Sequence, residues 1–389
     1  MGMRNALKWL GRILLLLVLA TAAVGLWKRD QITRLWAVNS LFDADRIVQN
    51  FSHMDRAFLS VPVPRGTGPV SPLPAGPAMT LPAVASDWIT ARNVTSLMVL
   101  HRGAVVHESY HRGTAPEDRR ISWSVAKSFL SALFGVVIAE GQIASLDDPV
   151  TRYAPSLAGS AYDGASIRHV LLMMSGVAFD EDYLDYASDI NRMGRVLALG
   201  GTMDGFAAGL TARDAAPGTR WQYVSIDTHI LAMVLRGATG RSLPDLLSEK
   251  IIQPLGFDSE PYYLTDGEGV AFALGGLNVT TRDYARFGLM AANLGRYNGQ
   301  QVVPEDWMRA ATTPTAPTAP GDLQYGFQWW MPADAQPGEF FGHGIYGQYI
   351  YIDRAREVVI IATSADRAFR EPGVKHGNIA VLRQIARAL

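Results

Sequence analysis

The chain has 389 residues, of which 48% are hydrophobic and 18% charged, and its formal net charge is −1. This composition excludes a disordered chain, and the near-neutral charge provides no basic surface for nucleic acid. Cysteine is absent, so disulfides, thiol catalysis and cysteine metal sites are excluded. The length predicts one large domain, or two closely packed lobes, with additions.

The N-terminus reads as a targeting or anchoring segment, which we assign to residues 1–28. Arg4, Lys8 and Arg12 precede an uncharged run over residues 13–27. We favour an uncleaved membrane helix, because residues 27–29 (Trp-Lys-Arg) are typical of an interfacial border. A signal cleaved near residues 20–22 (Ala-Thr-Ala) is the alternative. Either way we expect export, to the periplasmic side of the inner membrane if anchored or as a secreted protein if cleaved.

Two further segments precede the main domain. Residues 29–60 have the apolar spacing of a helical extension, which lies against a membrane or packs on the main domain. Residues 61–85 are rich in proline and predict an extended linker. We therefore place the main domain at residues 86–389.

The main domain carries predicted strands at both ends and helices between them. Residues 96–100 and 105–110 predict a hairpin, residues 124–140 a helix, and residues 150–320 mostly helices and loops. Residues 349–352 and 358–363 predict adjacent strands, followed by a helix over residues 374–389. This order predicts an α/β (α+β) fold in which one antiparallel sheet is flanked by helices and carries a helical lobe.

Ser124 and Lys127 stand at the start of the apolar helix predicted over residues 124–140. Residues three apart share a helix face, so the Lys127 amine can reach the Ser124 hydroxyl. An amine in an apolar setting loses its charge readily and becomes a base, which an arginine cannot do. Lysine is also scarce, because only five of the 35 basic residues are lysines. The pair predicts nucleophilic catalysis, and the alternative is a structural lysine that extends to water.

Two other segments match known motifs in sequence but not in their predicted secondary structure. Residues 107–111 have the H-E-x-x-H form of a zinc peptidase, but a strand would hold the histidines about 13 Å apart, too far for one zinc. Residues 342–347 match a dinucleotide-binding glycine pattern, but a strand follows instead of a helix. We expect a glycine-rich edge around His343 and Gly344 where backbone approaches a ligand, or a plain hairpin turn. We expect no metal and no cofactor.

Tyr223 is the best candidate for the second proton carrier that acyl transfer requires. It lies between a Pro-Gly turn at residues 217–218 and a helix predicted over residues 226–236. We expect a nearby ammonium group to lower the pKa of Tyr223, so that the phenol can shuttle a proton. The alternative is a tyrosine that anchors the loop through a hydrogen bond.

Taken together, residues 124–127 (Ser-Val-Ala-Lys), 223–225 (Tyr-Val-Ser) and 342–344 (Gly-His-Gly) resemble the motifs of the serine β-lactamase and penicillin-binding-protein superfamily. They are most similar to its class C and esterase side. Residues 167–176, 254–256 and 281–288 resemble the 6-aminohexanoate-dimer hydrolase branch. The resemblance covers roughly residues 85–389.

The resemblance implies a β-lactamase-like sandwich with specific roles for several residues. Ser124 would be the acyl-accepting nucleophile, Lys127 the general base and Tyr223 the proton relay. The backbone N–H groups of Ser124 and Ile345 would form an oxyanion hole. The remaining substrate contacts would come from four residues: Tyr183, Ser225, His343 and Gly344.

Two departures from the family pattern bear on the substrate. The usual K-T-G is replaced by residues 342–344, which lack the cation that would bind a β-lactam carboxylate, and Ser225 stands where asparagine is common. Both favour ester or small-amide substrates. We therefore expect a membrane-associated or secreted serine hydrolase that works through an acyl-enzyme on a small molecule. The alternatives are a penicillin-binding protein, D-alanyl-peptide hydrolase or β-lactamase, and a catalytically inactive envelope binding module.

Overall fold

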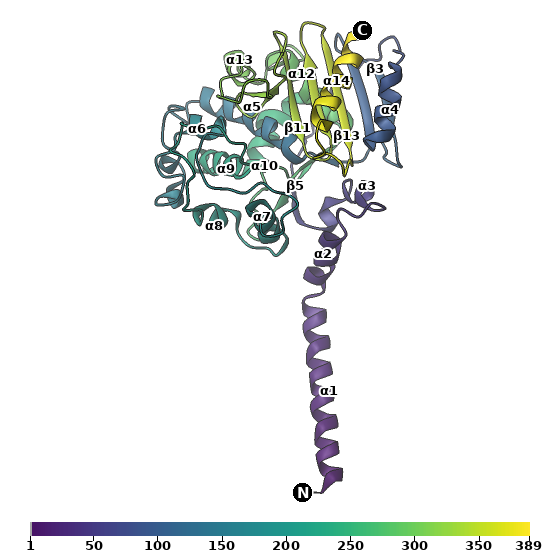
Figure 1. The fold of residues 1–389 in the computed structure, drawn as a ribbon, viewed down its shortest axis with the longest axis vertical. Helices are drawn as coiled ribbons and strands as arrows, with labels where there is room; N and C mark the ends of the chain where they lie inside the picture. Colours follow the sequence, from purple (N-terminus) through teal and green to yellow (C-terminus); the bar gives the residue numbers. More distant parts are fainter. Residues whose placement is uncertain (1) are drawn as a thin grey trace.

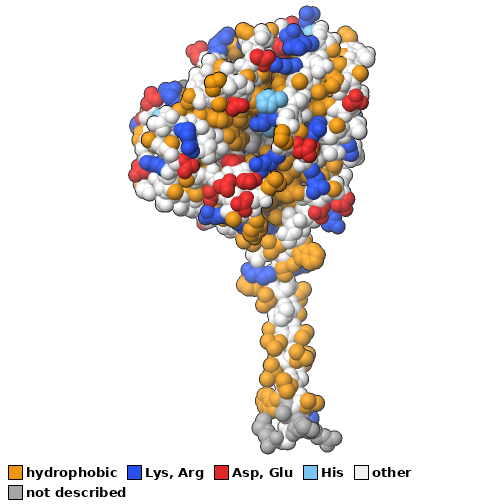
Figure 2. Space-filling view, viewed as in Figure 1, with side chains coloured by type: hydrophobic (Ala, Val, Ile, Leu, Met, Phe, Trp, Pro, Cys, Tyr) orange, Lys and Arg blue, Asp and Glu red, His pale blue; other side chains and the backbone are white. Residues whose placement is uncertain are grey.

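A single long helix projects from the rest of the molecule (Figure 1). The structure is a computed structural model that describes residues 2–389, and this first helix is α1 (Met3–Trp27). Its segment Leu7–Trp27 is long and apolar enough to cross a membrane, with a mean hydropathy of 2.1. Hydrophobic side chains cover most of the visible surface of α1, whereas the domain surface mixes both signs of charge (Figure 2).

The extension that follows α1 packs on the main domain. Leu41, Ile47 and Phe51 are buried in the main core, and Arg120 binds the extension with its buried guanidinium. Nη1 of Arg120 donates to the carbonyl oxygen of Val48 at 2.6 Å and to Oγ of Ser52 at 2.8 Å. The elements of this segment are α2 (Arg29–Asn39), α3 (Ile47–Asn50), the 3₁₀ turn η1 (Met54–Arg56) and β1 (Leu59–Pro62).

The main sheet has seven antiparallel strands in the order β3-β2-β13-β12-β11-β10-β9. The first hairpin pairs with the last strand, with Val99 opposite Ile360, so both ends of the domain close one sheet, as the sequence predicted. The strands are β2 (Val94–His101), β3 (Ala104–Tyr110), β9 (Gln324–Tyr325), β10 (Trp330–Met331), β11 (Glu339–Gly344), β12 (Gln348–Asp353) and β13 (Val358–Ser364).

Helices cover both faces of this sheet, so its strands are apolar on both sides. Helices α4 (Ala83–Ala91) and α14 (Val374–Arg387) pack on one face, where Leu97 and Val99 point. Helix α12 (Thr281–Ala292) packs on the other face, toward which Met98 and Leu100 point. Alternating side chains of a strand point to opposite faces, which explains this division.

A helical lobe lies beside the sheet, and helix α5 (Ala126–Ala139) runs between the two (Figure 1). The lobe and its neighbours contain α6 (Ile167–Leu171), α7 (Asp189–Ala198), α8 (Met203–Ala208), α9 (Ile226–Thr239), α10 (Leu243–Leu247), η5 (Ser248–Ile252), α11 (Gln253–Leu255) and α13 (Glu305–Ala311). Short turns η3 (Val150–Arg152) and η4 (Pro155–Leu157) lead into it. The predicted sandwich with a helical lobe is confirmed.

A smaller antiparallel sheet joins the extension to the start of α5. Its order is β1-β5-β6-β4, so β1 of the extension and β4 just before α5 belong to one sheet. The other strands are β4 (Arg120–Ile121), β5 (Tyr262–Thr265) and β6 (Leu277–Val279), and a separate pair is formed by β7 (Arg296–Tyr297) and β8 (Gln300–Gln301).

Residues 107–110 of the H-E-x-x-H motif lie on strand β3, as predicted, and His111 directly follows the strand. Nε2 of His107 and Nε2 of His111 both hydrogen-bond with Oγ of Ser109, at 2.9 Å and 3.0 Å. These ring nitrogens therefore have a structural partner on the strand surface. Within residues 2–389 no group of three metal-ligating side chains converges.

Candidate active site

Ser124 lies in a 3₁₀ turn, η2 (Trp123–Val125), that connects β4 to α5. The predicted helix over residues 124–140 therefore begins with a tighter turn before α5 proper. The turn is fixed from both sides, because the N–H of Ser122 donates to the carbonyl oxygen of Leu277 at 2.8 Å and α5 is buried. Ser124 lines a cavity of about 480 Å³.

Lys127 is buried one helical turn after Ser124, with only 1% of its surface exposed. Its Nζ lies 3.0 Å from Oγ of Ser124, 2.8 Å from the carbonyl oxygen of Leu274 and 3.4 Å from Oγ of Ser225. Burial lowers the pKa of Lys127 to about 7, although nearby Glu181 and Asp227 favour its charged form. A neutral amine has two N–H donors and one lone pair. A neutral Lys127 can therefore donate to the Leu274 carbonyl and to Ser225 while it accepts from the Ser124 hydroxyl.

Tyr223 reaches the same point from the loop before α9. The Nζ of Lys127 lies 5.5 Å from the centroid of the Tyr223 ring, which stacks on Trp330 at 5.2 Å. The predicted lowering of the Tyr223 pKa is wrong. Burial raises the pKa of Tyr223, and the Glu181 charge adds to this, against hydrogen bonds with Ser124 and Ser225 that act in the opposite direction. The phenol therefore keeps its proton at neutral pH and is a proton donor.

The end of strand β11 abuts the backbone of the Ser124 turn. A Cβ atom on Gly344 would lie 2.5 Å from the carbonyl oxygen of Ser122 and 3.1 Å from the N atom of Ser124, so only glycine fits. The next residue, Ile345, lines the cavity together with Ser124. This packing brings Ser124 and Ile345 to the same cavity.

Two more predicted residues, His343 and Tyr183, also line the cavity. Burial lowers the pKa of His343 to about 3, with a further contribution from the Lys375 charge, so His343 is neutral. The Tyr183 hydroxyl donates to Oε2 of Glu181 at 2.9 Å. The structure thus brings the residues predicted from the sequence together: Ser124, Lys127, Tyr183, Tyr223, Ser225, His343, Gly344 and Ile345.

Comparison with known proteins places this site in a family. The family model described as Beta-lactamase matches residues 87–382, which includes every residue of the site. The chain belongs to the beta-lactamase family. Its relatives include proteins that are named as hydrolases.

Three relatives sharpen the comparison. The 6-aminohexanoate-dimer hydrolase of Paenarthrobacter ureafaciens is 32% identical over 339 residues, which cover 81% of this chain and 85% of that protein. A structure from Bacillus anthracis described as a 6-aminohexanoate-dimer hydrolase has a TM-score of 0.79 at 24% identity, covering 89% of this chain and 95% of that one. EstCE1, a hydrolase with promiscuous acyltransferase activity, has a TM-score of 0.63 at 17% identity, covering 78% of this chain and 96% of that one.

Glu181 is a site residue that the sequence did not single out. Its Oε1 accepts a hydrogen bond from the backbone N–H of Ser225, and its Oε2 accepts one from Tyr183. Burial raises the pKa of Glu181, against the opposing effect of the Lys127 charge. In this member of the beta-lactamase family, Glu181 thus ties the Tyr223 loop to the loop that bears Tyr183. In the sequence, the only indication of this role was that Glu181 lies two residues before Tyr183.

Lys375 is the second site residue that sequence reasoning missed. It comes from the first turn of α14, lines the cavity and places its Nζ 5.0 Å from the centroid of the Trp330 ring. Burial lowers the pKa of Lys375, against the opposing effect of the Asp322 charge, and Asp322 lines the same cavity. A lysine amine therefore faces the Ser124 cavity although residues 342–344 supply none. The scarcity of lysine was the available signal.

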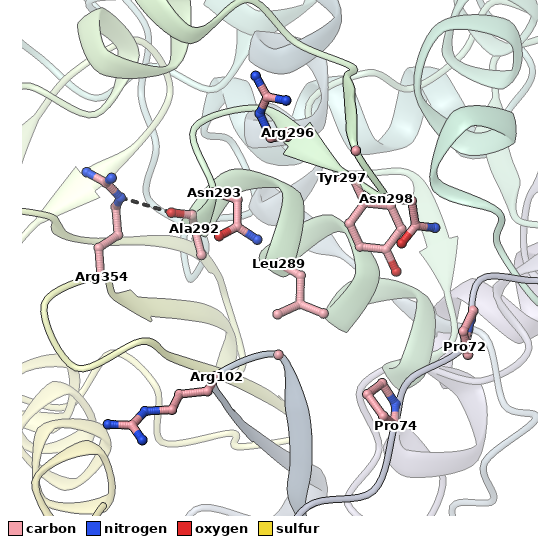
Figure 3. A pocket seen from close by; sticks show the side chains of 12 residues that line it. Pro72, Pro74, Arg102, Leu289, Ala292, Asn293, Arg296, Tyr297, Asn298 and Arg354 are labelled. Atoms are coloured by element: carbon pink, nitrogen blue, oxygen red, sulfur yellow. Dashed lines mark hydrogen bonds between the residues drawn. The ribbon is translucent and has the colours of Figure 1, made fainter.

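A second cavity, of about 610 Å³, lies on another part of the surface (Figure 3). Three arginines line it, but their guanidinium groups point in different directions and not toward one shared point (Figure 3). Arg102 pairs with Glu357 at 3.1 Å, and Nε of Arg354 donates to the carbonyl oxygen of Ala292 at 2.9 Å. Among the described residues that line this cavity there is no serine, lysine, histidine or acid.

Proposed function

We propose that this hydrolase cleaves carboxylic esters or small amides through an acyl-enzyme on Ser124. The observation that carries the proposal is the distance of 3.0 Å between Nζ of Lys127 and Oγ of Ser124. Lys127 is buried, and this burial lowers its pKa to about 7. A nucleophile in hydrogen-bond reach of a base that is neutral near physiological pH is the arrangement that acyl transfer needs.

Acylation begins when Oγ of Ser124 attacks the substrate carbonyl carbon and Nζ of Lys127 takes the hydroxyl proton. The carbonyl oxygen becomes an oxyanion, which the N–H groups of Ser124 and Ile345 stabilise. The tetrahedral intermediate then breaks its bond to the leaving oxygen or nitrogen. Tyr223 donates its proton to that atom and recovers one from Lys127 through Ser225, whose Oγ lies 3.4 Å from Nζ.

Deacylation follows the same route in reverse, with water in place of the leaving group. Water attacks the acyl carbon as it gives a proton to the Tyr223 and Lys127 pair. The bond to Oγ of Ser124 breaks, and that oxygen regains a proton from Lys127. Every group returns to its starting protonation state, so the cycle needs no metal and no cofactor.

The substrate class follows from the cavity and from the relatives. Aromatic side chains line much of the cavity, including Tyr183, Trp330 and Phe369, which suits an apolar acyl or leaving group. One relative is named for an amide dimer of 6-aminohexanoate, and another is a hydrolase with acyltransferase activity. These support small esters and amides as substrates.

Labelling with a fluorophosphonate probe tests the nucleophile. The parent enzyme should be labelled, and Ser124→Ala should not. Ser131→Ala is the matched control, because Ser131 lies on the same helix with its Oγ donating to the carbonyl oxygen of Phe327. Labelling of Ser124→Ala at the parent level overturns the assignment. Labelling without turnover of any p-nitrophenyl ester would instead favour an inactive binding module.

A second candidate is hydrolysis of a substrate that carries a carboxylate, such as a penicillin or a D-alanyl peptide. The position of Lys375 in the Ser124 cavity favours it, since an ammonium held in a partly apolar site gains from an anionic ligand. Covalent capture of a fluorescent penicillin by the parent, and weaker capture by Lys375→Met, would support this candidate. No capture by the parent would exclude it.

We also propose that α1 places the domain outside the cytoplasm, as an uncleaved anchor or as a signal that is removed. Its apolar length supports both possibilities. N-terminal sequencing of the mature protein distinguishes them, because a cleaved chain would begin after about residue 22. Membrane fractionation of the uncleaved chain should place it with the bilayer.

A further inference from the structure

The two amides of the proposed oxyanion hole are each next to a strained aromatic residue. Trp123, immediately before Ser124, has φ of 42°, and Tyr346, immediately after Ile345, has φ of 60°. A bulky side chain rarely adopts this left-handed conformation, and it persists only where its surroundings fix it. The Ser124 amide belongs to the peptide between Trp123 and Ser124, and the Ile345 amide lies one residue before Tyr346. A change of conformation at either aromatic residue would therefore shift the backbone that carries one of these amides.

The contacts that hold these two residues include side chains from the segment between α1 and the main domain. Phe42 stacks on Tyr346 with centroids 5.3 Å apart and an interplanar angle of 11°. Phe51 meets Trp123 edge to face at 5.5 Å and Tyr346 at 5.2 Å. All six pairs within the group are 5.2 to 6.3 Å apart, so four rings form one aromatic cluster: Phe42, Phe51, Trp123 and Tyr346. Tyr346 also contacts Phe369, which lines the cavity, with ring centroids 4.4 Å apart.

Hydrogen bonds and a cation–π contact attach the extension to the segment just before Ser124. The N–H of Ile121 donates to the carbonyl oxygen of Phe51 at 3.1 Å, only three residues before Ser124. The guanidinium of Arg120 lies 5.9 Å from the centroid of the Phe51 ring and donates to Val48 and Ser52. Phe51 is fully buried, whereas Phe42 is 40% exposed and closes the cluster from outside.

We propose that Phe42 and Phe51 are positioning residues, which hold Trp123 and Tyr346 in their left-handed conformations and so align both oxyanion-hole amides. The proposal rests on the proposed function, because it assigns the extension a task in stabilising the oxyanion. Preorganised donors are effective only when they point at the developing charge, so a small rotation of either peptide lowers the rate. Residues 42–51 are then part of the catalytic unit.

The test compares four variants of the full chain in detergent: Phe51→Ala, Phe51→Leu, Phe42→Ala and Phe58→Ala. Phe58 is the matched control, because it is a buried phenylalanine of the same extension outside the aromatic cluster. We expect Phe51→Ala to lower kcat for a p-nitrophenyl ester by about 10 to 10²-fold with KM nearly unchanged. Phe51→Leu should recover part of that loss, and Phe42→Ala should lose about threefold to tenfold.

A thionoester substrate separates positioning from general destabilisation. Sulfur accepts hydrogen bonds more weakly than oxygen, so an intact oxyanion hole favours the ester over its thionoester. We expect the ester-to-thionoester rate ratio to fall in Phe51→Ala and Phe42→Ala and to stay at the parent value in Phe58→Ala. A parent ratio and parent kcat in folded Phe51→Leu and Phe42→Ala would overturn the proposal. Full turnover by Ser124→Ala would instead overturn the proposed function itself.

Discussion

At the start of helix α5 Lys127 is buried and forms no salt bridge with any residue that the structure describes, whereas near the other end of α5 Lys250 forms ion pairs. Nζ of Lys250 lies 2.7 Å from Oε1 of Glu140, which caps α5, and 2.8 Å from Oε1 of Glu249. Hydrogen bonds to these carboxylates raise the pKa of Lys250, whereas burial lowers that of Lys127 to about 7. The same amine is thus a fixed cation at one end of α5 and a base at the other, and the surroundings decide which.

Replacing each lysine by arginine tests most directly whether Lys127 acts as a base and Lys250 as a cation. Arginine keeps its charge, so Lys127→Arg removes the base, and we expect kcat/KM to fall by about 10² to 10⁴-fold. Lys250→Arg should retain parent activity, because an arginine can still pair with Glu140 and Glu249. Ester hydrolysis by the two purified variants measures this. Comparable activity of Lys127→Arg and the parent would mean that Lys127 is not the base.

Gly344→Ala tests whether close backbone packing sets the Ser124 turn. The added Cβ would lie 2.5 Å from the carbonyl oxygen of Ser122, so the turn or the strand must shift. We expect kcat to fall by about 10²-fold, since small misplacements of reacting groups have effects of this size. Gly141→Ala is a control beyond the far end of α5, at a residue that does not line the cavity and where a Cβ meets no atom within 4 Å. Its φ of 75° makes a small loss of stability the expected result there.

The pH profile shows directly which form of Lys127 is active. The neutral amine is the base, so kcat/KM should fall about tenfold per pH unit below about 7 and level off above it. Burial also raises the pKa of Asp227 to about 7, so this carboxyl titrates in the same range. The Asp227→Asn variant separates the two groups. In this variant the fall of kcat/KM at low pH, the acid limb of the profile, should persist. It should move to lower pH, because Asp227 favours the charged form of Lys127. Loss of the limb would assign it to Asp227.

The Glu181→Gln variant removes a carboxylate charge near Lys127, whereas Lys250 keeps the two carboxylates that it pairs with. The difference between the two lysines should therefore increase. Glu181 is the leading nearby charge that favours the Lys127 ammonium. Its removal lowers the Lys127 pKa further, so the acid limb of kcat/KM should move to lower pH while glutamine keeps the hydrogen bond from Tyr183. A limb that moves to higher pH would contradict this electrostatic role.

The sequence predicted the fold and most of the site because those features depend on local patterns. Alternating apolar residues identified the β2–β3 hairpin and strands β12 and β13. The strand context around His107 correctly placed residues 107–110 of the H-E-x-x-H motif on β3. The spacing of Ser124 and Lys127 within a helix start also implied their contact, which the structure places at 3.0 Å.

The features that the sequence missed depend on burial and on contacts between distant segments. The direction of the Tyr223 pKa was wrong because an ammonium group was expected to dominate, whereas desolvation is the larger effect. Lys375 lies in the last helix, and Phe42 lies in the extension, so no local spacing connects either one to Ser124. Such contacts follow from the packing of the whole domain.

The smallest expected effect, that of Lys250→Met, completes the comparison between the two ends of α5. This substitution removes an amine whose ion pairs lie near the surface, with 19% of the side chain exposed. We expect a loss of about 0 to 1 kcal/mol in the free energy of unfolding, because such pairs gain little over hydration. The acid limb of kcat/KM should not move, because the Lys250 charge is not among the causes of the Lys127 pKa shift. Urea denaturation and a pH profile of the same sample measure both quantities. A displaced limb would show that charge at the far end of α5 reaches the site, and burial alone would then no longer account for the Lys127 pKa.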